Sequence, residues 1–168
     1  YDYFNINNGY RYMTRINANI PPSHLCDQHL LAEHREIIRV RHVQSSKSKA
    51  PAQFTLGKGH VLFFKDKLGF IFYRYKLLYA ECKRRGFNVD NYESSFNGYD
   101  LSGQWGSTYF NSSFYIMPNQ LVMTRIKERL YTMNNIRYGG NPISLKSAIE
   151  LLNIIKLPNS SPRDKVLL

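Results

Sequence analysis

One run of the sequence constrains the fold more than any other. Residues 61–85, VLFFKDKLGFIFYRYKLLYAECKRR, combine large apolar and aromatic side chains with a basic end, and Gly86 follows directly. A glycine just past a basic last turn is typical of a helix C-terminus, because glycine adopts the left-handed conformation without steric cost. The run therefore predicts a helix over 61–85 that ends at Gly86, and its Phe, Leu and Tyr content makes it the expected centre of the core.

A second stretch without Gly or Pro, from about residue 24 to 41, also predicts a helix, with Ser23 as its N-cap. On a helical wheel the side expected to pack consists of Leu30, Leu31, His34, Ile37 and Ile38. The side expected to be displayed consists of Gln28, Ala32, Arg35 and Arg39, with Glu36 at its edge. A carboxylate bracketed by guanidiniums resembles a pocket in which arginines hold phosphates and a glutamate handles protons. Taken alone, the spacing favours a surface ion-pair network.

The rest of the chain alternates helices with long connections. Residues 44–60 and 87–117 are rich in Gly, Ser, Asn or Pro and predict loops, the second of them irregular or partly stranded. Two further helices are predicted, one through 119–133 and one over 145–155 capped by Ser144. A chain of 168 residues suits one domain. The expected fold class is therefore all-α, mostly α-helical with long irregular loops, in a compact single domain of three to four helices.

The charge of the chain points to a polyanionic partner. The formal net charge is +11, and residues 42–86 hold 10 basic against 2 acidic side chains. Nucleic acid is the expected partner, with a solvated basic face as the alternative, and a membrane surface is not expected. No window reaches the roughly 18 apolar residues of a membrane span, and Cys26 and Cys82 lie in predicted helices, as is typical of reduced thiols. We expect an intracellular protein, whether cytoplasmic, nucleoid, organellar or virus-associated.

The clustered histidines do not predict a metal site. His24, His29 and His34 recur every five residues, which turns a helix by about 500° and leaves neighbouring rings about 140° apart. They cannot share one ion, so neither a metal nor another cofactor is expected. The acidic residues of the same segment are also expected not to share a helical face, which argues against a glycosidase-type acid pair. They are Asp27, Glu33 and Glu36.

Four strings in the same order resemble one known family. They are MTRIN at 13–17, DQHLLAEHREIIR at 27–39, FTLGKGHVLFFKDKLGF at 54–70 and AECKRRGFN at 80–88. They are similar to the phage pyrimidine dimer DNA glycosylases, a family also called endonuclease V. The resemblance implies a compact helical glycosylase and apurinic/apyrimidinic lyase that works without metal, kinks duplex DNA at a cyclobutane dimer and flips a base out of the stack. It implies a family domain over 13–143, an N-terminal extension of 1–12, and a C-terminal helix and basic tail over 144–168.

The resemblance also implies roles for individual residues. Thr14, once Met13 is removed, would supply its α-amine as the nucleophile that forms a Schiff base; such an amine, with a pKa near 8, keeps a usable neutral fraction at pH 7. Glu36 would stabilise the developing positive sugar and manage proton transfers. The residues expected to bind DNA around the lesion are Arg15, Gln28, His29, Arg35, Arg39, Lys58, Arg137 and Tyr138. For His29 a purely structural role is an equal expectation.

The chain departs from the family at both ends. NIRYGGNPIS, at 135–144, stands where the family carries an aromatic and basic string that packs near the dimer, a difference that bears on dimer specificity. YDYFNINNGYRY precedes MTRIN, and with it attached the nitrogen of Thr14 is an amide. Three hypotheses follow: the extension is trimmed, the start is assigned upstream of the true one, or catalysis is lost. The first two predict an enzyme acting as a monomer on damaged double-stranded DNA. The third predicts an inactive homologue that binds nucleic acid, including RNA, or is a structural subunit of a larger assembly such as a ribonucleoprotein or virion.

Overall fold

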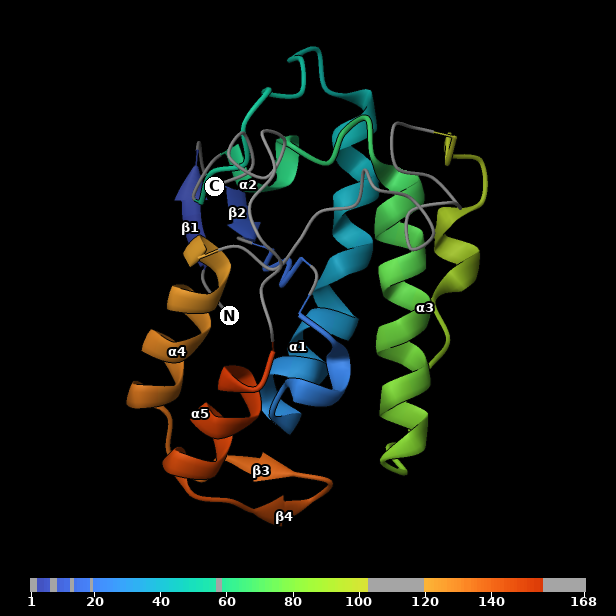
Figure 1. Cartoon of the computed structure of the whole chain (residues 1–168). Helices are drawn as coiled ribbons and strands as arrows, with labels where there is room; N and C mark the ends of the chain where they lie inside the picture. Colours follow the sequence, from blue (N-terminus) through green and yellow to red (C-terminus); the bar gives the residue numbers. More distant parts are fainter. Residues whose placement is uncertain are drawn as a thin grey trace.

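The computed structural model describes residues 3–6, 9–12, 14–18, 20–56, 59–102 and 120–155. Most of this part of the chain is helical, which confirms the predicted fold class (Figure 1). With η for a 3-10 helix, the elements in chain order are β1 (Tyr3–Ile6), β2 (Gly9–Tyr12), η1 (Pro22–His24), α1 (Asp27–Glu36), η2 (Ile37–Ser45), α2 (Gly59–Leu62), α3 (Leu68–Arg84), η3 (Glu93–Phe96), α4 (Gln120–Thr132), β3 (Arg137–Tyr138), β4 (Asn141–Pro142) and α5 (Leu145–Asn153). The predicted DNA-binding residue Lys58 lies outside the described residues.

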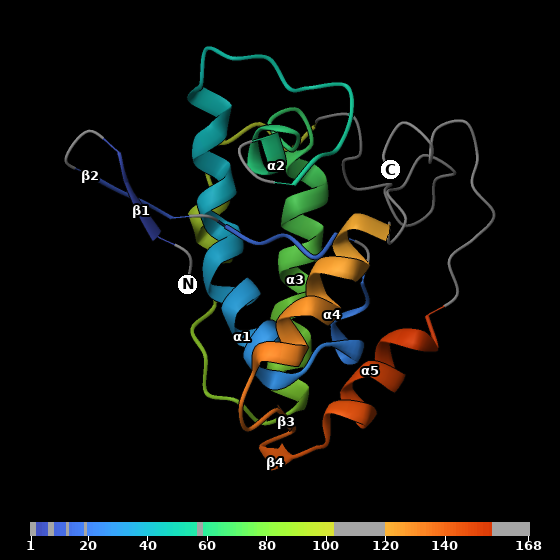
Figure 2. The ribbon, with the colours of Figure 1, turned by 90° about the vertical axis from the view of Figure 1, so that its left-hand side faces the viewer.

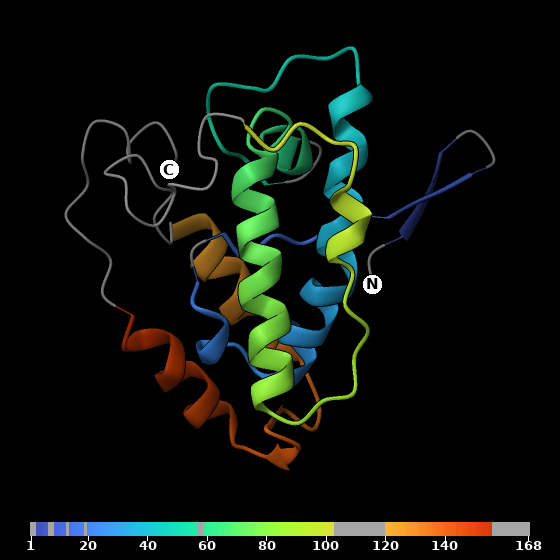
Figure 3. The same cartoon turned by 90° about the vertical axis from the view of Figure 1, so that its right-hand side faces the viewer.

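Helix α3 is the centre of the core, as the sequence predicted. It lies alongside α1 and η2 and contacts η1 and η3 (Figures 1 and 3). Its end is also as predicted, because Gly86 adopts φ +84° and donates its N–H to the carbonyl of Lys83 at 2.9 Å. The N–H of Phe87 reaches back to the carbonyl of Cys82 at 3.0 Å, which completes a Schellman motif.

The beginning of the predicted 61–85 helix is wrong, because the chain turns through residues 63–66 and separates α2 from α3. Phe63 and Phe64 are both fully buried there, and both pack edge-on against Phe54, at centroid distances of 5.4 and 6.0 Å. Consecutive residues of a helix point about 100° apart, so an unbroken helix would turn one ring away from the other. Burial of both rings accounts for the break.

The predicted 24–41 helix is wrong at both ends. Ser23 belongs to η1, and α1 begins at Asp27 with Cys26 at the N-cap. After Glu36 the chain continues as the 3-10 helix η2.

The C-terminal part forms a separate layer of two helices beside α1. Helix α4 lies within the predicted 119–133 range, and α5 begins after Ser144, whose hydroxyl accepts the N–H of Ser147 at 3.0 Å as a cap. The two helices contact each other, and the short β3–β4 hairpin joins them. Gly139 and Gly140, at φ +61° and +82°, form the hairpin turn, which the sequence analysis did not predict.

The antiparallel β1–β2 ribbon was also not predicted. Its register pairs Tyr3 with Tyr12, and the ribbon extends away from the helices (Figure 2). Among the residues whose burial is described, the apolar core runs from Ile16 to Leu152. Among the helices that the structure describes, none is long and apolar enough to cross a membrane.

Candidate functional site

An extended segment, residues 14–17, lies along α1 and carries the start of the site. The N–H of Arg15 donates to Oε1 of Glu36 at 3.4 Å, and the N–H of Asn17 donates to Oε2 of Glu33 at 3.2 Å. Alternate N–H groups of an extended chain face the same side, so both reach α1. Thr14 is only 6% exposed and precedes Arg15 directly. The structure therefore brings Thr14 and Glu36, the two residues implied as catalytic, to one place.

Glu36 lies deeper than the helical wheel predicted. It was placed at the edge of a displayed face, but it is 1% exposed, whereas Arg35 is exposed and Arg39 is half-buried. Segment 14–17 covers this side of α1, which periodicity within one helix could not reveal. Oε2 of Glu36 is buried and has no hydrogen-bond partner among the described residues. A buried carboxylate oxygen in this state can receive a proton or a ligand donor.

Glu33 and Glu36 share a face, which corrects the prediction that the acidic residues of α1 diverge. Three residues rotate a helix by about 300°, so these side chains point only about 60° apart. Both carboxylates accept from segment 14–17. Their environments differ, because Glu33 is also bound in two places by Arg74, at 2.7 and 2.9 Å. The charge of Glu33 is thus balanced within the core.

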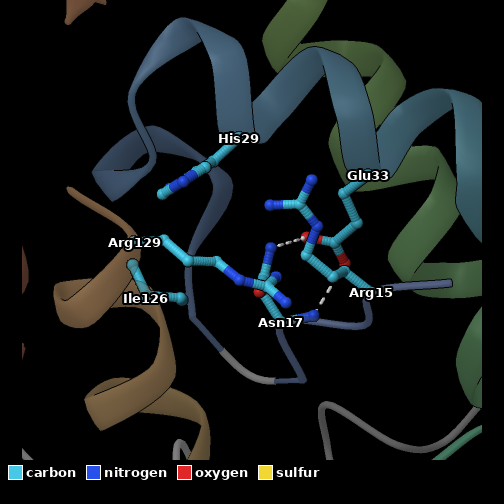
Figure 4. Close-up of a pocket in the computed structure, with 6 residues that line it drawn as sticks. All are labelled: Arg15, Asn17, His29, Glu33, Ile126 and Arg129. Carbon is cyan, nitrogen blue, oxygen red and sulfur yellow. Dashed lines mark hydrogen bonds between the residues drawn. The ribbon is translucent and has the colours of Figure 1, made fainter. Parts of the chain in front are cut away.

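A narrow pocket opens between α1, α4 and segment 14–17 (Figure 4). The space between its lining side chains is about 220 Å³ when open solvent is included, and it is too narrow to enclose a water molecule. In Figure 4, Arg129 of α4 approaches Arg15 from the side opposite α1, and His29 closes one end. The lining residues are Arg15, Asn17, His29, Glu33, Ile126 and Arg129.

His29 is a neutral residue at this pocket. Its side chain is almost entirely buried. Burial and, after it, the positive charges of Arg15, Arg129 and Arg125 together lower its pKa from 6.5 to about 4. With the charge of Glu33 balanced by Arg74, these guanidiniums leave the pocket electropositive.

Two of these arginines were missed by the sequence analysis. Arg125 and Arg129 are four residues apart on α4 and therefore share a face. Arg125 donates from Nη2 to the carbonyl of Ile16 at 3.0 Å and to Oδ1 of Asn17 at 3.3 Å. The signal was a pair of arginines at helical spacing in the predicted 119–133 helix, but nothing local indicated that this helix would lie on segment 14–17.

Gln28, Arg137 and Tyr138 come together around the β3–β4 hairpin. The side chain of Gln28 donates to the carbonyl of Asn135 at 2.7 Å and accepts the N–H of Arg137 at 3.2 Å. The hydroxyl of Tyr138 donates to the carbonyl of Ser23 at 2.8 Å. The side chain of Arg137 is exposed, whereas those of Gln28 and Tyr138 are half-buried and engaged with the protein itself. Their role in DNA binding stays a prediction.

Asp27 fixes this hairpin to the start of α1. Its two carboxylate oxygens accept the N–H groups of Gly139 and Gly140 at 2.8 and 2.7 Å. Arg85 of the α3 C-terminus donates to the same carboxylate at 2.8 Å, and its guanidinium lies 3.9 Å from the ring centroid of Tyr138. This structural role of Asp27 was not predicted from the sequence, in which Asp27 was only excluded from an acid pair.

The site contains no arrangement suited to a metal in the part of the chain that the structure describes, since no three His, Cys, Asp or Glu side chains converge there. A buried carboxylate with an open oxygen lies beside an electropositive pocket on a helical scaffold. Guanidiniums and a buried carboxylate in this arrangement are suited to an anionic ligand and to proton exchange with it.

The comparison with known proteins indicates which kind of anionic ligand is concerned. Residues 13–93 match the family model of the pyrimidine dimer DNA glycosylases. This match supports the family that the four strings resemble. The match includes segment 14–17, α1 and α3, and ends before α4. It supports DNA as the anionic ligand and DNA repair as the process.

Proposed function

We propose that the protein is a DNA glycosylase with apurinic/apyrimidinic lyase activity in a form that begins at Thr14. Its nucleophile is the α-amine of Thr14 and its catalytic carboxylate is Glu36. The observation that carries the proposal is the buried Glu36, which is next to the start of segment 14–17 and has an unbonded Oε2 among the described residues. The match of residues 13–93 to the glycosylase family supports the same reaction class.

The chemistry needs a free amine and an acid–base group. The amine nitrogen attacks C1′ of the damaged nucleotide, the glycosidic bond breaks, and the base leaves with a proton. Loss of a second amine proton with ring opening gives an imine, and this imine acidifies the C2′ proton. Removal of that proton breaks the C3′–O bond and releases the phosphate. Glu36 is suited to move these protons because its carboxylate is shielded from water.

In this proposal the arginines of the pocket bind the phosphates of the DNA backbone. Arg15 and Arg129 line the pocket, and Arg125 lies close enough to lower the pKa of His29. Arginine is suited to phosphate because its planar fork donates two parallel hydrogen bonds. His29 stays neutral at pH 7, so it can contribute a hydrogen bond to the ligand but no charge. The exposed Arg35 and the half-buried Arg39 of the same helical region can contact phosphates farther along the duplex.

The test is capture of the imine with borohydride on duplex DNA that contains an abasic site. Protein beginning at Thr14 is expected to give a covalent complex, and the chain beginning at Tyr1 is expected to give none. Glu36→Gln should abolish strand cleavage and spare DNA binding, whereas Glu150→Gln, the same change at an exposed position of α5, should leave cleavage unchanged. If protein with a verified Thr14 N-terminus formed no trapped complex, the proposed enzymatic activity would be refuted. A duplex with a cyclobutane dimer tests lesion preference in the same assay.

The alternative is a homologue without catalysis that keeps residues 1–13 and binds nucleic acid. It is favoured by one observation: in the printed sequence the nitrogen of Thr14 is part of a peptide bond, behind the β1–β2 ribbon. An amide nitrogen is not nucleophilic, so this form predicts salt-dependent binding that is unaffected by Glu36→Gln. The family match bears on DNA and lends no support to RNA or a larger assembly as the partner.

A further inference from the structure

We propose that Glu33 is a positioning residue: through its buried ion pair with Arg74 it holds segment 14–17 in the register that places Thr14 beside Glu36. The catalytic consequence rests on the proposed function above, whereas the structural consequence does not. The two carboxylates lie one turn apart on α1 and would then have different roles. Glu33 holds segment 14–17 in place, and Glu36 transfers protons.

Glu33 is saturated with donors. Oε1 accepts from Nδ2 of Asn17 at 2.7 Å and from Nη2 of Arg74 at 2.9 Å. Oε2 accepts from the backbone N–H of Asn17 at 3.2 Å and from Nε of Arg74 at 2.7 Å. All three residues are at least 97% buried, so these bonds are shielded from competing water. Asn17 is therefore held through both its backbone and its side chain (Figure 4).

Arg74 also fixes the chain beyond Asn17. Its Nη1 donates to the carbonyl of Ile20 at 2.6 Å, three residues after Asn17. From the other side, Arg125 of α4 donates to the carbonyl of Ile16 at 3.0 Å. Ile16, Asn17 and Ile20 are thus bound by α1, α3 and α4 together. Thr14 and Arg15 directly precede these residues.

The relative lengths of the bonds indicate which carboxylate sets the register. Glu36 makes one backbone contact, to Arg15 at 3.4 Å, which is long for a hydrogen bond. Glu33 makes two bonds to Asn17 and two to Arg74, and three of these four are between 2.7 and 2.9 Å. Residues 15 and 17 are separated by about 6.6 Å in an extended chain, so fixing Asn17 also fixes Arg15. Glu36 can therefore keep an open oxygen, because it is not needed to hold the segment.

Asn17→Ala is the most direct test. It removes the 2.7 Å bond to Glu33 and the 3.3 Å bond that Oδ1 accepts from Arg125, and it leaves the Glu33–Arg74 pair intact. Glu33→Gln would instead bury the charge of Arg74 without a carboxylate. Arg74→Lys is a second variant, which keeps the charge and loses the two-pronged geometry. Tyr75→Phe is the matched control, since it removes the hydrogen bonds of the neighbouring α3 residue to His34 and to the N–H of Tyr92, away from segment 14–17.

The first readout is borohydride trapping with protein that begins at Thr14, on duplex DNA with an abasic site. A displacement of reacting groups by about 1 Å costs about a hundredfold in rate, so we expect Asn17→Ala and Arg74→Lys to trap ten- to a hundredfold more slowly at saturating DNA, with unchanged affinity. Tyr75→Phe should trap at the parental rate. If the Asn17 and Arg74 variants matched Tyr75→Phe, Glu33 would have no positioning role in catalysis.

The second readout is hydrogen exchange of the peptide covering residues 14–20, measured on the full chain. Asn17→Ala should speed exchange of this peptide at least tenfold, and Tyr75→Phe should not change it. Unchanged exchange in Asn17→Ala would overturn the inference whether or not the protein is an enzyme. If the parental protein beginning at Thr14 failed to trap DNA while exchange responded as expected, only the proposed function would fail.

Discussion

The most quantitative prediction concerns His29 and the pH dependence of stability. This histidine is buried beside three guanidiniums, and its pKa in the folded protein is about 4, against an ordinary value of 6.5. Since one pH unit of difference corresponds to 1.36 kcal/mol, the folded state disfavours the protonated ring by about 3 kcal/mol in total. Replacement by glutamine keeps a polar side chain of similar length and removes the titration.

The direction in which stability changes with pH depends on whether the folded or the unfolded chain binds the proton more tightly. Below pH 6.5 the unfolded chain protonates His29, while the folded protein does not until the pH approaches about 4. The free energy of unfolding contributed by this residue is therefore fully present above pH 6.5 and falls as the pH decreases through that window. At pH 5 the expected loss is about 2 kcal/mol.

Urea unfolding at pH 7.5, 6, 5 and 4.5 provides the assay. The parental protein should lose stability over this range more steeply than His29→Gln, and the difference between the two should reach about 2 kcal/mol at pH 5. His34, whose pKa is also lowered by burial, titrates in both proteins and cancels in the difference. His42→Gln, at an exposed position, is the control and should retain the parental slope. Equal slopes for the parental protein and His29→Gln, or an NMR titration of His29 near pH 6.5, would refute the reasoning.

Three further predictions concern stability and are measured by urea unfolding at pH 7.5. Tyr75→Phe removes the 2.9 Å bond to Nε2 of His34 and the 2.7 Å bond that the hydroxyl accepts from the N–H of Tyr92, and should cost about 1 to 3 kcal/mol; no loss would mean that these bonds contribute nothing net. Gly86→Ala places a Cβ at φ +84° and should cost about 1 to 2 kcal/mol, although there is open space around that position, so a neutral result would contradict a conformational cause. Ser144→Ala removes the cap of α5 and should cost about 1 kcal/mol, with Ser95→Ala, outside any cap, expected to be neutral.

The fold could be predicted where the signals were local. The last turn of α3 follows from its basic residues and Gly86, and α5 follows from the Ser144 cap and its apolar spacing. The predictions failed where distant residues decide. The break before α3 depends on Phe54, which lies in another segment, and a helical pattern within 61–85 contains no information about it. The two hairpins are short, and local pattern alone gave no strand signal for them.

For the candidate site, the strings of the family located Thr14, Arg15 and Glu36, and the structure brings these together. The depth of Glu36 could not be predicted, because a wheel shows only how side chains are distributed around one helix. Glu36 is buried because segment 14–17 covers it, and α1 and α4 bind that segment from opposite sides. The contribution of α4 was missed for the same reason: spacing indicates that Arg125 and Arg129 share a face, but not what the face meets.

Two glutamates one turn apart on α1 show how burial and partners decide the use of the same side chain. Glu33 accepts four hydrogen bonds and has a guanidinium to balance its charge, so its carboxylate is committed to structure. Glu36 is equally buried, but its Oε2 has no partner among the described residues, a state that costs stability. Such a cost persists where function requires the group, since an oxygen already bonded within the protein could not exchange protons with a ligand. The ion pair of Glu33 allows the two glutamates to differ in this way, because it fixes segment 14–17 beside Glu36 without using the carboxylate of Glu36.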